Sequence, residues 1–353
     1  KFKQWLEPLG LEVVWLSGSQ RKKAKDEAKA KLADGTVKIA VGTHALFSDD
    51  VEFQNLGLVI VDEQHRFGVA QRLALKNKGR DVHQLMMSAT PIPRTLAMSF
   101  FADLDVSVID ELPPGRTPIK TRLVNNVRRA EVEGFVLNIC RKGQQAYWVC
   151  PLIEESETLQ LQTATETLEQ LQAALPELNI GLVHGRMKAA EKAEVMAQFA
   201  AGRLNVLVAT TVIEVGVDVP NAALMVIEHA ERMGLAQLHQ LRGRVGRGAA
   251  ESVCVLLFAE PLSELAKARL KVIYEHTDGF EIARQDLNIR GPGEFLGARQ
   301  SGVPMLRFAN LEEDLHLLEQ AREIAPLLIE QNPEIVEAHL ARWLASREGY
   351  LGV

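Results

Sequence analysis

Short apolar runs that alternate with amphipathic stretches constrain the fold of this chain more than any other feature. The runs are rich in β-branched residues and have the length of buried strands: residues 37–41, 58–61, 84–87, 146–149, 181–183, 206–209, 224–227 and 253–258. The stretches between them repeat apolar positions with the period of a helix: residues 20–32, 130–139, 159–175 and 188–199. This alternation predicts an α/β fold with parallel sheets that helices cover on both faces.

A proline-rich segment divides the α/β pattern into two similar lengths. Residues 113–118 contain three prolines and one glycine, which suit neither a helix interior nor a central strand. We therefore expect a first α/β lobe at 1–112, a linker at 113–118 and a second α/β lobe at 119–260. Residues 261–353 form a mainly helical unit in this prediction, with helices at 262–274, 311–330 and 333–346.

The composition is that of a globular protein, with 47% hydrophobic residues, 24% charged residues and a net charge of −6. No apolar run approaches the roughly 18 residues that cross a bilayer, so we expect no contact with a membrane. The three cysteines lack CxxC spacing and no signal peptide is visible, which favours a cytoplasmic protein without a disulfide framework. Because the chain starts at Lys1 within an apparent helix, we expect it to be part of a longer protein.

Two adjacent acids follow the apolar run at 58–61. Asp62 and Glu63 would lie at the carboxyl end of a strand, where open α/β sheets bind their ligands. One carboxylate there could hold a Mg²⁺ that keeps most of its waters, and the other could orient or deprotonate an attacking water. A solvated strand end followed by a turn explains the same two acids equally well.

Two further segments carry groups that suit phosphate. Ser88 and Thr90 follow the run at 84–87, either as phosphate-binding hydroxyls or as an ordinary helix cap. Arg242, Arg244 and Arg247 alternate with glycines, and guanidinium groups that point into a cleft bind phosphate oxygens in pairs. A solvated basic loop is the alternative for the arginines.

The order of these segments resembles superfamily 2 helicases. Residues 62–65, 88–90, 206–218 and 240–247 resemble motifs II, III, V and VI of that superfamily, in that order. Four further segments narrow the resemblance to the RecG type of ATP-dependent DNA helicase: residues 91–96, 112–118, 145–156 and 290–297. The resemblance implies two RecA-like parallel-sheet lobes, the first incomplete at its N-terminus, and a mainly helical C-terminal unit.

The resemblance also assigns roles in the first lobe. Asp62 would help to hold Mg²⁺ and Glu63 would activate water, while Gln64 and His65 would couple the nucleotide state to the other lobe. Ser88 and Thr90 of motif III would serve the same coupling. Gly42 and Thr43 resemble the motif Ib contact to a nucleic-acid phosphate, made by a backbone N–H and a hydroxyl.

In the second lobe the resemblance makes Arg247 the arginine finger and turns Arg244 toward the γ-phosphate, with Gln240 lining the same cleft. Motif V touches both nucleotide and nucleic acid in such motors. Its matching positions are Gly216 and Asp218 for the nucleotide and Thr210 and Thr211 for DNA, with Glu214 also in the motif. Without the resemblance, this segment is a strand, a turn and a polar loop.

Residues 269–300 resemble the TRG motif, which converts lobe closure into movement along duplex DNA. Arg269, Arg290 and Gln300 match its main polar positions. A packing subdomain with a turn at 291–293 is the alternative that the residues alone favour. His44 and His184 belong to no cluster of possible metal ligands, so we expect both to be architectural.

The loop that cradles nucleotide phosphates in such motors is missing from this sequence. A GxxxxGK[ST] loop needs a glycine followed by lysine, and none of the 25 glycines is followed by lysine. A RecG-like protein would carry this loop and a wedge region before Lys1. We therefore expect these 353 residues alone to hydrolyse no ATP at a useful rate.

The resemblance implies an ATP- and Mg²⁺-dependent translocase on branched or forked duplex DNA, which reverses replication forks and migrates Holliday junctions in recombination and repair. It would be a monomer in the bacterial cytoplasm, associated with the nucleoid and in contact with single-strand DNA-binding protein. The alternatives are a transcription-repair coupling factor and a DNA-binding module without hydrolysis. An RNA helicase is less favoured, because no module that reads 2′-hydroxyls is visible.

Overall fold

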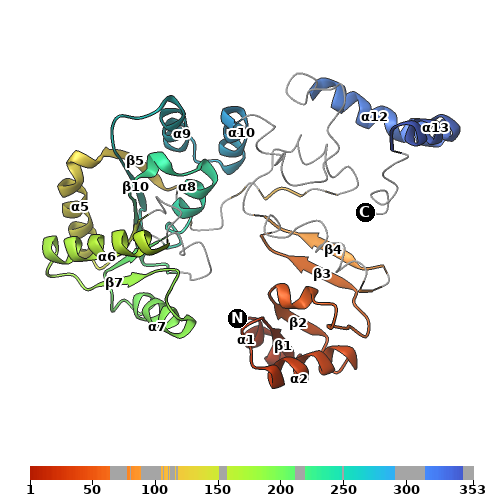
Figure 1. Ribbon diagram of the computed structural model, residues 1–353, viewed down its shortest axis with the longest axis horizontal. Helices are drawn as coiled ribbons and strands as arrows, with labels where there is room; N and C mark the ends of the chain where they lie inside the picture. The colour runs from red at the N-terminus through yellow and green to blue at the C-terminus, as the bar shows by residue number, and fades with distance from the viewer. Residues whose placement is uncertain are drawn as a thin grey trace. The chain divides into compact units, whose positions relative to one another are not determined.

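The computed structural model describes residues 1–63, 78–79, 81–88, 105, 107–109, 111, 116, 118–150, 157–210, 219–248, 250–290 and 315–344. The chain divides into two compact units. The first unit comprises Lys1–Ala89 and Leu327–Val353, and the second comprises Thr90–Pro326. Figure 1 labels the helices and strands of both units. The domain boundaries expected from the sequence stay a prediction.

The first unit begins with a short helix, α1 (Phe2–Leu6), and a 3-10 turn at Glu7–Leu9. Strands β1 (Val13–Leu16) and β2 (Ile39–Gly42) then pair in parallel, and helix α2 (Lys22–Ala33) connects them. One small core combines residues of β1 and α2 with two residues outside the strands and helices. Its members are Val14, Leu16, Ala28, Leu32, Val37 and Val51. A 3-10 turn at His44–Phe47 follows β2.

A second parallel pair in the first unit joins β3 (Leu58–Val61) to β4 (His83–Met86). Its core contains the buried residues Val59 and Val61, with Phe47, Leu56, Val82 and Met86 packed against them. The two apolar residues of β3 that alternate with these, Leu58 and Ile60, are 56% and 57% exposed. Within the described residues, this sheet is therefore covered on one face only.

The second unit is built on six parallel strands in the order β5-β10-β9-β6-β8-β7. Their bounds are β5 (Lys120–Asn125), β6 (Gln145–Val149), β7 (Ile180–Val183), β8 (Val206–Ala209), β9 (Ala222–Ile227) and β10 (Val253–Phe258). Runs of consecutive apolar residues form the four strands β6, β8, β9 and β10, as expected for a parallel sheet that is buried on both faces. The predicted parallel α/β fold is confirmed.

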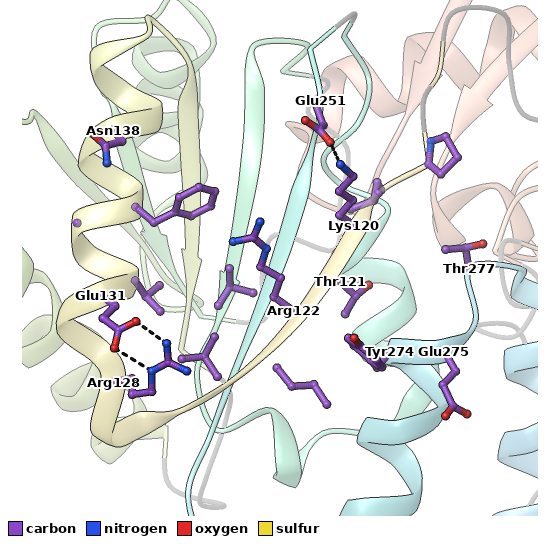
Figure 2. Close-up of a pocket in the computed structure, with 18 residues that line it drawn as sticks. Lys120, Thr121, Arg122, Arg128, Glu131, Asn138, Glu251, Tyr274, Glu275 and Thr277 are labelled. Carbon is purple, nitrogen blue, oxygen red and sulfur yellow. Dashed lines mark hydrogen bonds and ion pairs between the residues drawn. The ribbon is translucent and has the colours of Figure 1, made fainter.

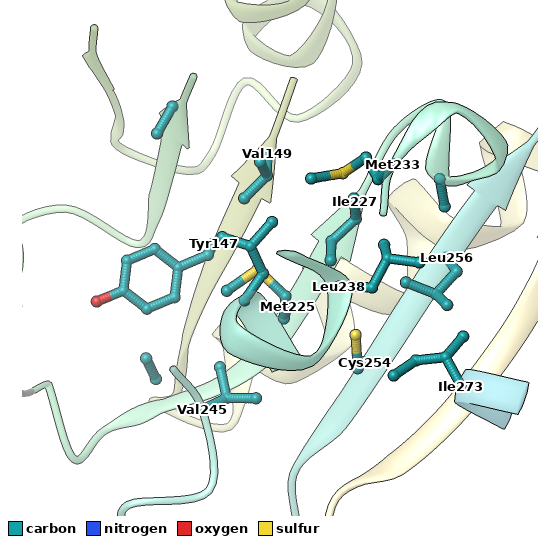
Figure 3. Close-up of a cluster of buried hydrophobic side chains, with 14 of the residues drawn as sticks. Tyr147, Val149, Met225, Ile227, Met233, Leu238, Val245, Cys254, Leu256 and Ile273 are labelled. Carbon is teal, nitrogen blue, oxygen red and sulfur yellow. The ribbon is translucent and has the colours of Figure 1, made fainter. Parts of the chain in front are cut away.

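Helices cover both faces of this sheet. One face packs on α5 (Arg129–Arg141), which follows a 3-10 turn at Asn126–Arg128, and on α6 (Glu157–Ala174). The opposite face packs on α7 (Ala189–Ala200), α8 (Leu235–Arg242), α9 (Glu264–Glu275) and α10 (Gly279–Arg290). A 3-10 turn at Ala230–Arg232 precedes α8. Figure 3 shows how side chains from β6, β9, β10, α8 and α9 interlock in the second of these cores.

Two helices near the end of the chain, α12 (Leu315–Gln331) and α13 (Pro333–Leu344), confirm the two that the sequence predicts there. Among the described helices, none combines the length and the apolar character that crossing a bilayer requires. Cys140, Cys150 and Cys254 are free and buried. Burial raises the pKa of the Cys140 thiol to about 11, so this group is a thiol rather than a thiolate at neutral pH.

Candidate functional site

The acidic pair lies where the sequence places it, at the carboxyl end of β3. The side chain of Asp62 is exposed, and its Oδ1 accepts a hydrogen bond from the backbone N–H of Glu63 at 2.9 Å. Glu63 has a φ of 54°, a left-handed conformation that costs an L-residue with a side chain about 1–2 kcal/mol. Such local strain is concentrated at functional sites, where the side-chain direction matters more than backbone stability.

Pairing with β4 brings Ser88 to the same edge of the sheet. Val61 is opposite Met86 in the register, and the N–H of Met87 donates to the carbonyl of Val61 at 2.7 Å. Asp62, directly after β3, and Ser88, two residues after the end of β4, therefore both lie at this edge of the sheet. Gln64, His65 and Thr90, which complete the predicted groups, lie outside the described residues.

The edge of the β1–β2 sheet carries Gly42 and Thr43. A Cβ at Gly42 would lie 2.2 Å from the carbonyl oxygen of Leu16, so only glycine allows the two strand ends to approach this closely. The N–H of Thr43 donates to the same oxygen at 3.1 Å. Thr43 is exposed and its hydroxyl does not cap the 3-10 turn that follows. Its contact to a nucleic-acid phosphate stays a prediction.

In the second unit the backbone ladder continues past the strands at their carboxyl ends. The N–H groups of Glu228, Cys150 and Thr210 donate to the carbonyls of the neighbouring strands, at 2.9, 2.8 and 3.3 Å. Thr210 is only 4% exposed, so its hydroxyl points into the structure. Its role in DNA binding stays a prediction, and Thr211, Glu214, Gly216 and Asp218 lie outside the described residues.

The segment predicted as motif VI forms α8 and the turn after it. Leu235, Leu238 and Leu241 recur at helical spacing and are fully buried, which fixes the face that α8 turns to the core. Gln240 and Arg244 are half-buried, and Arg247 is exposed. The role of Arg247 as arginine finger stays a prediction.

The glycines around these arginines have steric reasons of their own. Gly246 has a φ of 79°, and a Cβ at Gly248 would lie 2.3 Å from the carbonyl oxygen of Pro220. Both positions therefore exclude larger residues. The arginine of the predicted linker, Arg116, donates from Nη2 to the carbonyl of Gly243 at 3.0 Å, a contact that the sequence did not reveal.

Arg242 corrects the expectation that three arginines of this segment point into a cleft. It is 3% exposed, and its Nη1 donates to the carbonyls of Ile273 and His276 at 2.8 and 2.9 Å. Its Nη2 donates to the carbonyl of Thr277 at 3.3 Å. Burial lowers the pKa of its guanidinium. Arg242 therefore connects the end of α8 to the end of α9 and the turn before α10, and it is not available to a ligand.

The environment of α8 also determines the protonation state of His239. Burial is the main cause that lowers the pKa of its imidazole to about 4, and the nearby charges of Arg242 and Arg116 act in the same direction. His239 is thus neutral at pH 7. Among the predicted TRG residues, Arg269 lies on α9, and its buried Nε has no hydrogen-bond partner among the residues that the structure describes. The side chain of Arg290 and all of Gln300 lie outside the described part of the chain.

A buried ionic cluster lies at the carboxyl end of the six-stranded sheet, and the sequence did not predict it. Glu228 accepts a hydrogen bond from Nε1 of Trp148 at 2.8 Å and forms an ion pair with Arg129, whose guanidinium stacks over the Trp148 ring at 4.9 Å. Nε of Arg129 donates to Glu133 at 3.0 Å. Arg129 and Glu228 are 99 positions apart, and no local pattern signals such a pair.

A groove of about 1590 Å³ lies along the edge strand β5, and Figure 2 shows its lining. Two ion pairs sit in its wall, Lys120 with Glu251 and Arg128 with Glu131. None of the residues predicted for nucleotide or DNA lines it. Charged side chains on an edge strand, here Lys120 and Arg122 of β5, are a common protection against unwanted strand pairing, so we do not assign this groove to the chemistry.

A metal site in this chain would depend on few protein ligands. Within the described ranges, no three His, Cys, Asp or Glu side chains are grouped so that they could hold an ion. Asp62 fits Mg²⁺ nonetheless, because this ion keeps several waters and needs only one or two carboxylates beside the phosphates. His44 lies in an exposed 3-10 turn and His184 follows β7, and their architectural role stays a prediction.

Three family models match successive parts of the chain. The DEAD/DEAH box helicase model matches residues 1–99, the helicase conserved C-terminal domain matches 132–249, and the ATP-dependent DNA helicase RecG, domain 3, C-terminal model matches 276–343. A solved structure described as RecG bound to a three-way DNA junction is 47% identical, with a TM-score of 0.67 over 90% of this chain and 41% of that chain. Yeast Dbp5 bound to RNA, at 14% identity and a TM-score of 0.55, supports the fold alone.

Curated relatives match nearly the whole chain. The ATP-dependent DNA helicase RecG of Acidithiobacillus ferridurans is 57% identical over 350 residues, and that of Escherichia coli K12 is 56% identical over 354 residues. Each match covers 99% of this chain and 51% of the relative, so the chain spans about half the length of these relatives. With family models in the same order as the motifs and this identity throughout, the chain belongs to the RecG family of DNA helicases.

Proposed function

We propose that this chain forms the motor part of an ATP-dependent helicase that moves along duplex DNA and remodels branched DNA. The match to RecG proteins carries this proposal, because a relative at 47% identity is described as bound to a three-way DNA junction. The strained turn at Asp62 and Glu63 supports it, since a DNA-binding module without hydrolysis has no need for a left-handed glutamate.

In the proposed reaction, Asp62 holds Mg²⁺ through its carboxylate, and this ion neutralises phosphate charge when ATP is bound. Glu63 orients the attacking water and accepts its proton. Gln64 and His65 couple the nucleotide state to the other lobe, together with Ser88 and Thr90. Arg244 and Arg247 neutralise the charge that develops on the γ-phosphate, with Gln240, Gly216 and Asp218 beside the nucleotide.

The test is ATP turnover by the full-length natural protein on a synthetic replication fork and on linear duplex of equal length. The full-length protein is used because this chain holds no GxxxxGK[ST] sequence. Glu63→Gln should lower turnover by about 10²–10⁴-fold, the usual contribution of a positioned base. Glu52→Gln is the matched control, an exposed acid of the same unit, and should retain full turnover.

The outcomes distinguish three candidate functions. Strong preference for the fork that Glu63→Gln abolishes supports a branch-directed motor. Equal stimulation by linear duplex favours a general duplex translocase such as a transcription-repair coupling factor. No turnover on either DNA, or full turnover by Glu63→Gln, contradicts the proposal and favours a DNA-binding module.

The finer expectations about partners belong to the same proposal. Arg269, Arg290 and Gln300 transmit lobe movement to the duplex, while Gly42, Thr43 and Thr211 contact its backbone. The protein acts as a monomer at the bacterial nucleoid, where single-strand DNA-binding protein recruits it. Light scattering of the full-length protein with and without that partner tests both statements, because a dimer mass or an unchanged mass on mixing would contradict them.

A further inference from the structure

The first turn of α2 carries a group of cations without partners. Arg21, Lys22 and Lys23 are exposed, and none of them forms an ion pair or a hydrogen bond through its side chain within the described part of the chain. The lysines farther along the same helix differ, because Lys29 pairs with Asp50 and Lys31 pairs with Glu12. One helix therefore presents both unpaired and paired cations.

The unpaired cations do not serve the stability of α2. Arg21 occupies the N-cap without a side-chain hydrogen bond to the backbone, and the first turn contains no acid. Helix starts favour Ser, Thr, Asp or Asn as caps and acids in the first turn, because the backbone N–H groups carry partial positive charge there. Three cations at this end oppose that preference. The chain as a whole is acidic, with a net charge of −6, so general basicity does not explain them.

The position of these cations is fixed beside a predicted DNA contact. The loop between β1 and α2 is held by Gln20, whose Oε1 accepts from the N–H of Ser17 at 2.9 Å and whose Nε2 donates to the carbonyl of Trp15 at 3.0 Å. Because β1 and β2 are parallel neighbours, this loop and Thr43 emerge from the same edge of the sheet. The hydrogen bond from Thr43 to Leu16 ties the two strand ends together.

We propose that Arg21, Lys22 and Lys23 form a binding surface for the sugar–phosphate backbone of DNA that continues from Thr43. Such contacts neutralise phosphates and fix the position of the duplex without reading its sequence. This inference rests on the proposed function, because it assigns a second contact surface to the same DNA substrate. The exposed hydroxyl of Thr43 supplies one hydrogen bond, and the flexible cations supply charge on the adjoining surface.

The salt dependence of DNA binding tests the surface directly. Lys22→Ala/Lys23→Ala in the full-length protein is compared with Lys29→Ala/Lys31→Ala, a matched control on the same helix with the same loss of charge. Anisotropy of a labelled duplex, measured from 50 to 200 mM salt, gives the slope of log affinity against log salt. The first variant should lose about 2 from that slope, close to 1 for each phosphate contact, and several-fold in affinity at 50 mM salt.

The control should keep the wild-type slope, since its lysines are already paired with acids. Alanine is the best helix former, so neither variant should unfold α2, and the melting temperature and the DNA-free ATP turnover check this. Equal slopes in all three proteins, or an equal loss in both variants, would overturn the surface. A wild-type protein that neither binds DNA nor responds to it would overturn the proposed function instead.

A single-stranded probe of the same length shows whether the surface binds duplex or single-stranded DNA. Its counterion release is weaker, about 0.7 instead of 0.9 for each phosphate. Loss of slope with the duplex and not with the single strand supports a surface for duplex DNA. Loss with the single strand alone contradicts the assignment to the duplex backbone.

Discussion

Two parallel strands of this protein, β3 in the first unit and β8 in the second, have similar apolar sequences but opposite surroundings. Every residue of β8 is 0% exposed, because helices cover both faces of the second sheet. In β3, Leu58 and Ile60 are 56% and 57% exposed, while Val59 and Val61 are buried. The strand sequence is apolar throughout in both cases, but only β8 receives cover on both sides within the described residues.

The comparison shows what an apolar run does and does not determine. A run of consecutive apolar residues is suited to a parallel strand with two covered faces. The run itself specifies the strand, whereas the cover comes from other segments that must be present in the fold. Among the described residues, no segment supplies this cover for Leu58 and Ile60. The same substitution in the two strands measures this difference.

The largest effect on stability is expected in the six-stranded sheet of the second unit. Leu207→Ala removes a side chain that is 0% exposed and should lower the free energy of unfolding by about 2–5 kcal/mol. Leu58→Ala removes the same atoms from a side chain that is 56% exposed and should cost about 1 kcal/mol or less. Hydrogen exchange of the β8 and β3 amides measures the loss of local stability in each strand. Equal losses at the two positions would show that β3 is covered as well as β8.

A change of pH should act on the second unit through His239. Its pKa is about 4 in the folded protein, below the unfolded value near 6.5, so the unfolded chain binds the proton first as pH falls. The stability that the neutral imidazole contributes is therefore complete above pH 6.5 and is lost between pH 6.5 and pH 4, by up to about 3 kcal/mol.

The urea midpoint of the second unit at pH 7.5 and pH 5 measures this loss. His239→Gln removes the titrating group and should reduce the difference between the two midpoints. An unchanged difference in His239→Gln would assign the pH dependence to other groups, among them His184, whose pKa is also lowered by burial.

The smallest effect on stability is expected at the exposed face of β3. Leu58→Thr/Ile60→Thr should change the free energy of unfolding by about 0.5 kcal/mol or less, because both side chains are half-exposed. It should reduce concentration-dependent association of the 353-residue chain, since adjoining exposed apolar residues promote contact. Light scattering measures the association. Val127→Thr, at an apolar residue that is 90% exposed in the second unit, is the control without this effect.

The sequence predicted most of the elements whose apolar pattern is complete. The strands at 58–61, 206–209 and 253–258 have the predicted bounds. It missed β5, which lies at the edge of the sheet and contains only two apolar residues, Leu123 and Val124, too few for an apolar run. It also missed β1, α8 and α10. The leucines of α8 recur at helical spacing, but the glycines and arginines after them drew the interpretation toward a loop.

The candidate site was predictable only where a motif fixes the position along the chain. Asp62, Glu63 and Thr43 lie at strand ends as expected, because parallel strands bring their carboxyl ends to one edge. The burial of Arg242 and the pair between Arg129 and Glu228 depend on contacts between distant segments. Sequence spacing carries no information on which of several arginines is buried.

The hydrogen bonds of Arg242 have an evolutionary consequence. Three of its four acceptors, in Ile273, His276 and Thr277, are main-chain carbonyls, and such oxygens remain whatever side chain the residue bears. The fourth acceptor is the hydroxyl of Thr121, at 3.4 Å. The end of α9 can therefore drift in sequence without losing its connection to α8. Arg242 has no comparable freedom, because no other side chain places several donors in one rigid plane. One side of this contact should tolerate variation among relatives, and the other should hold a single residue type.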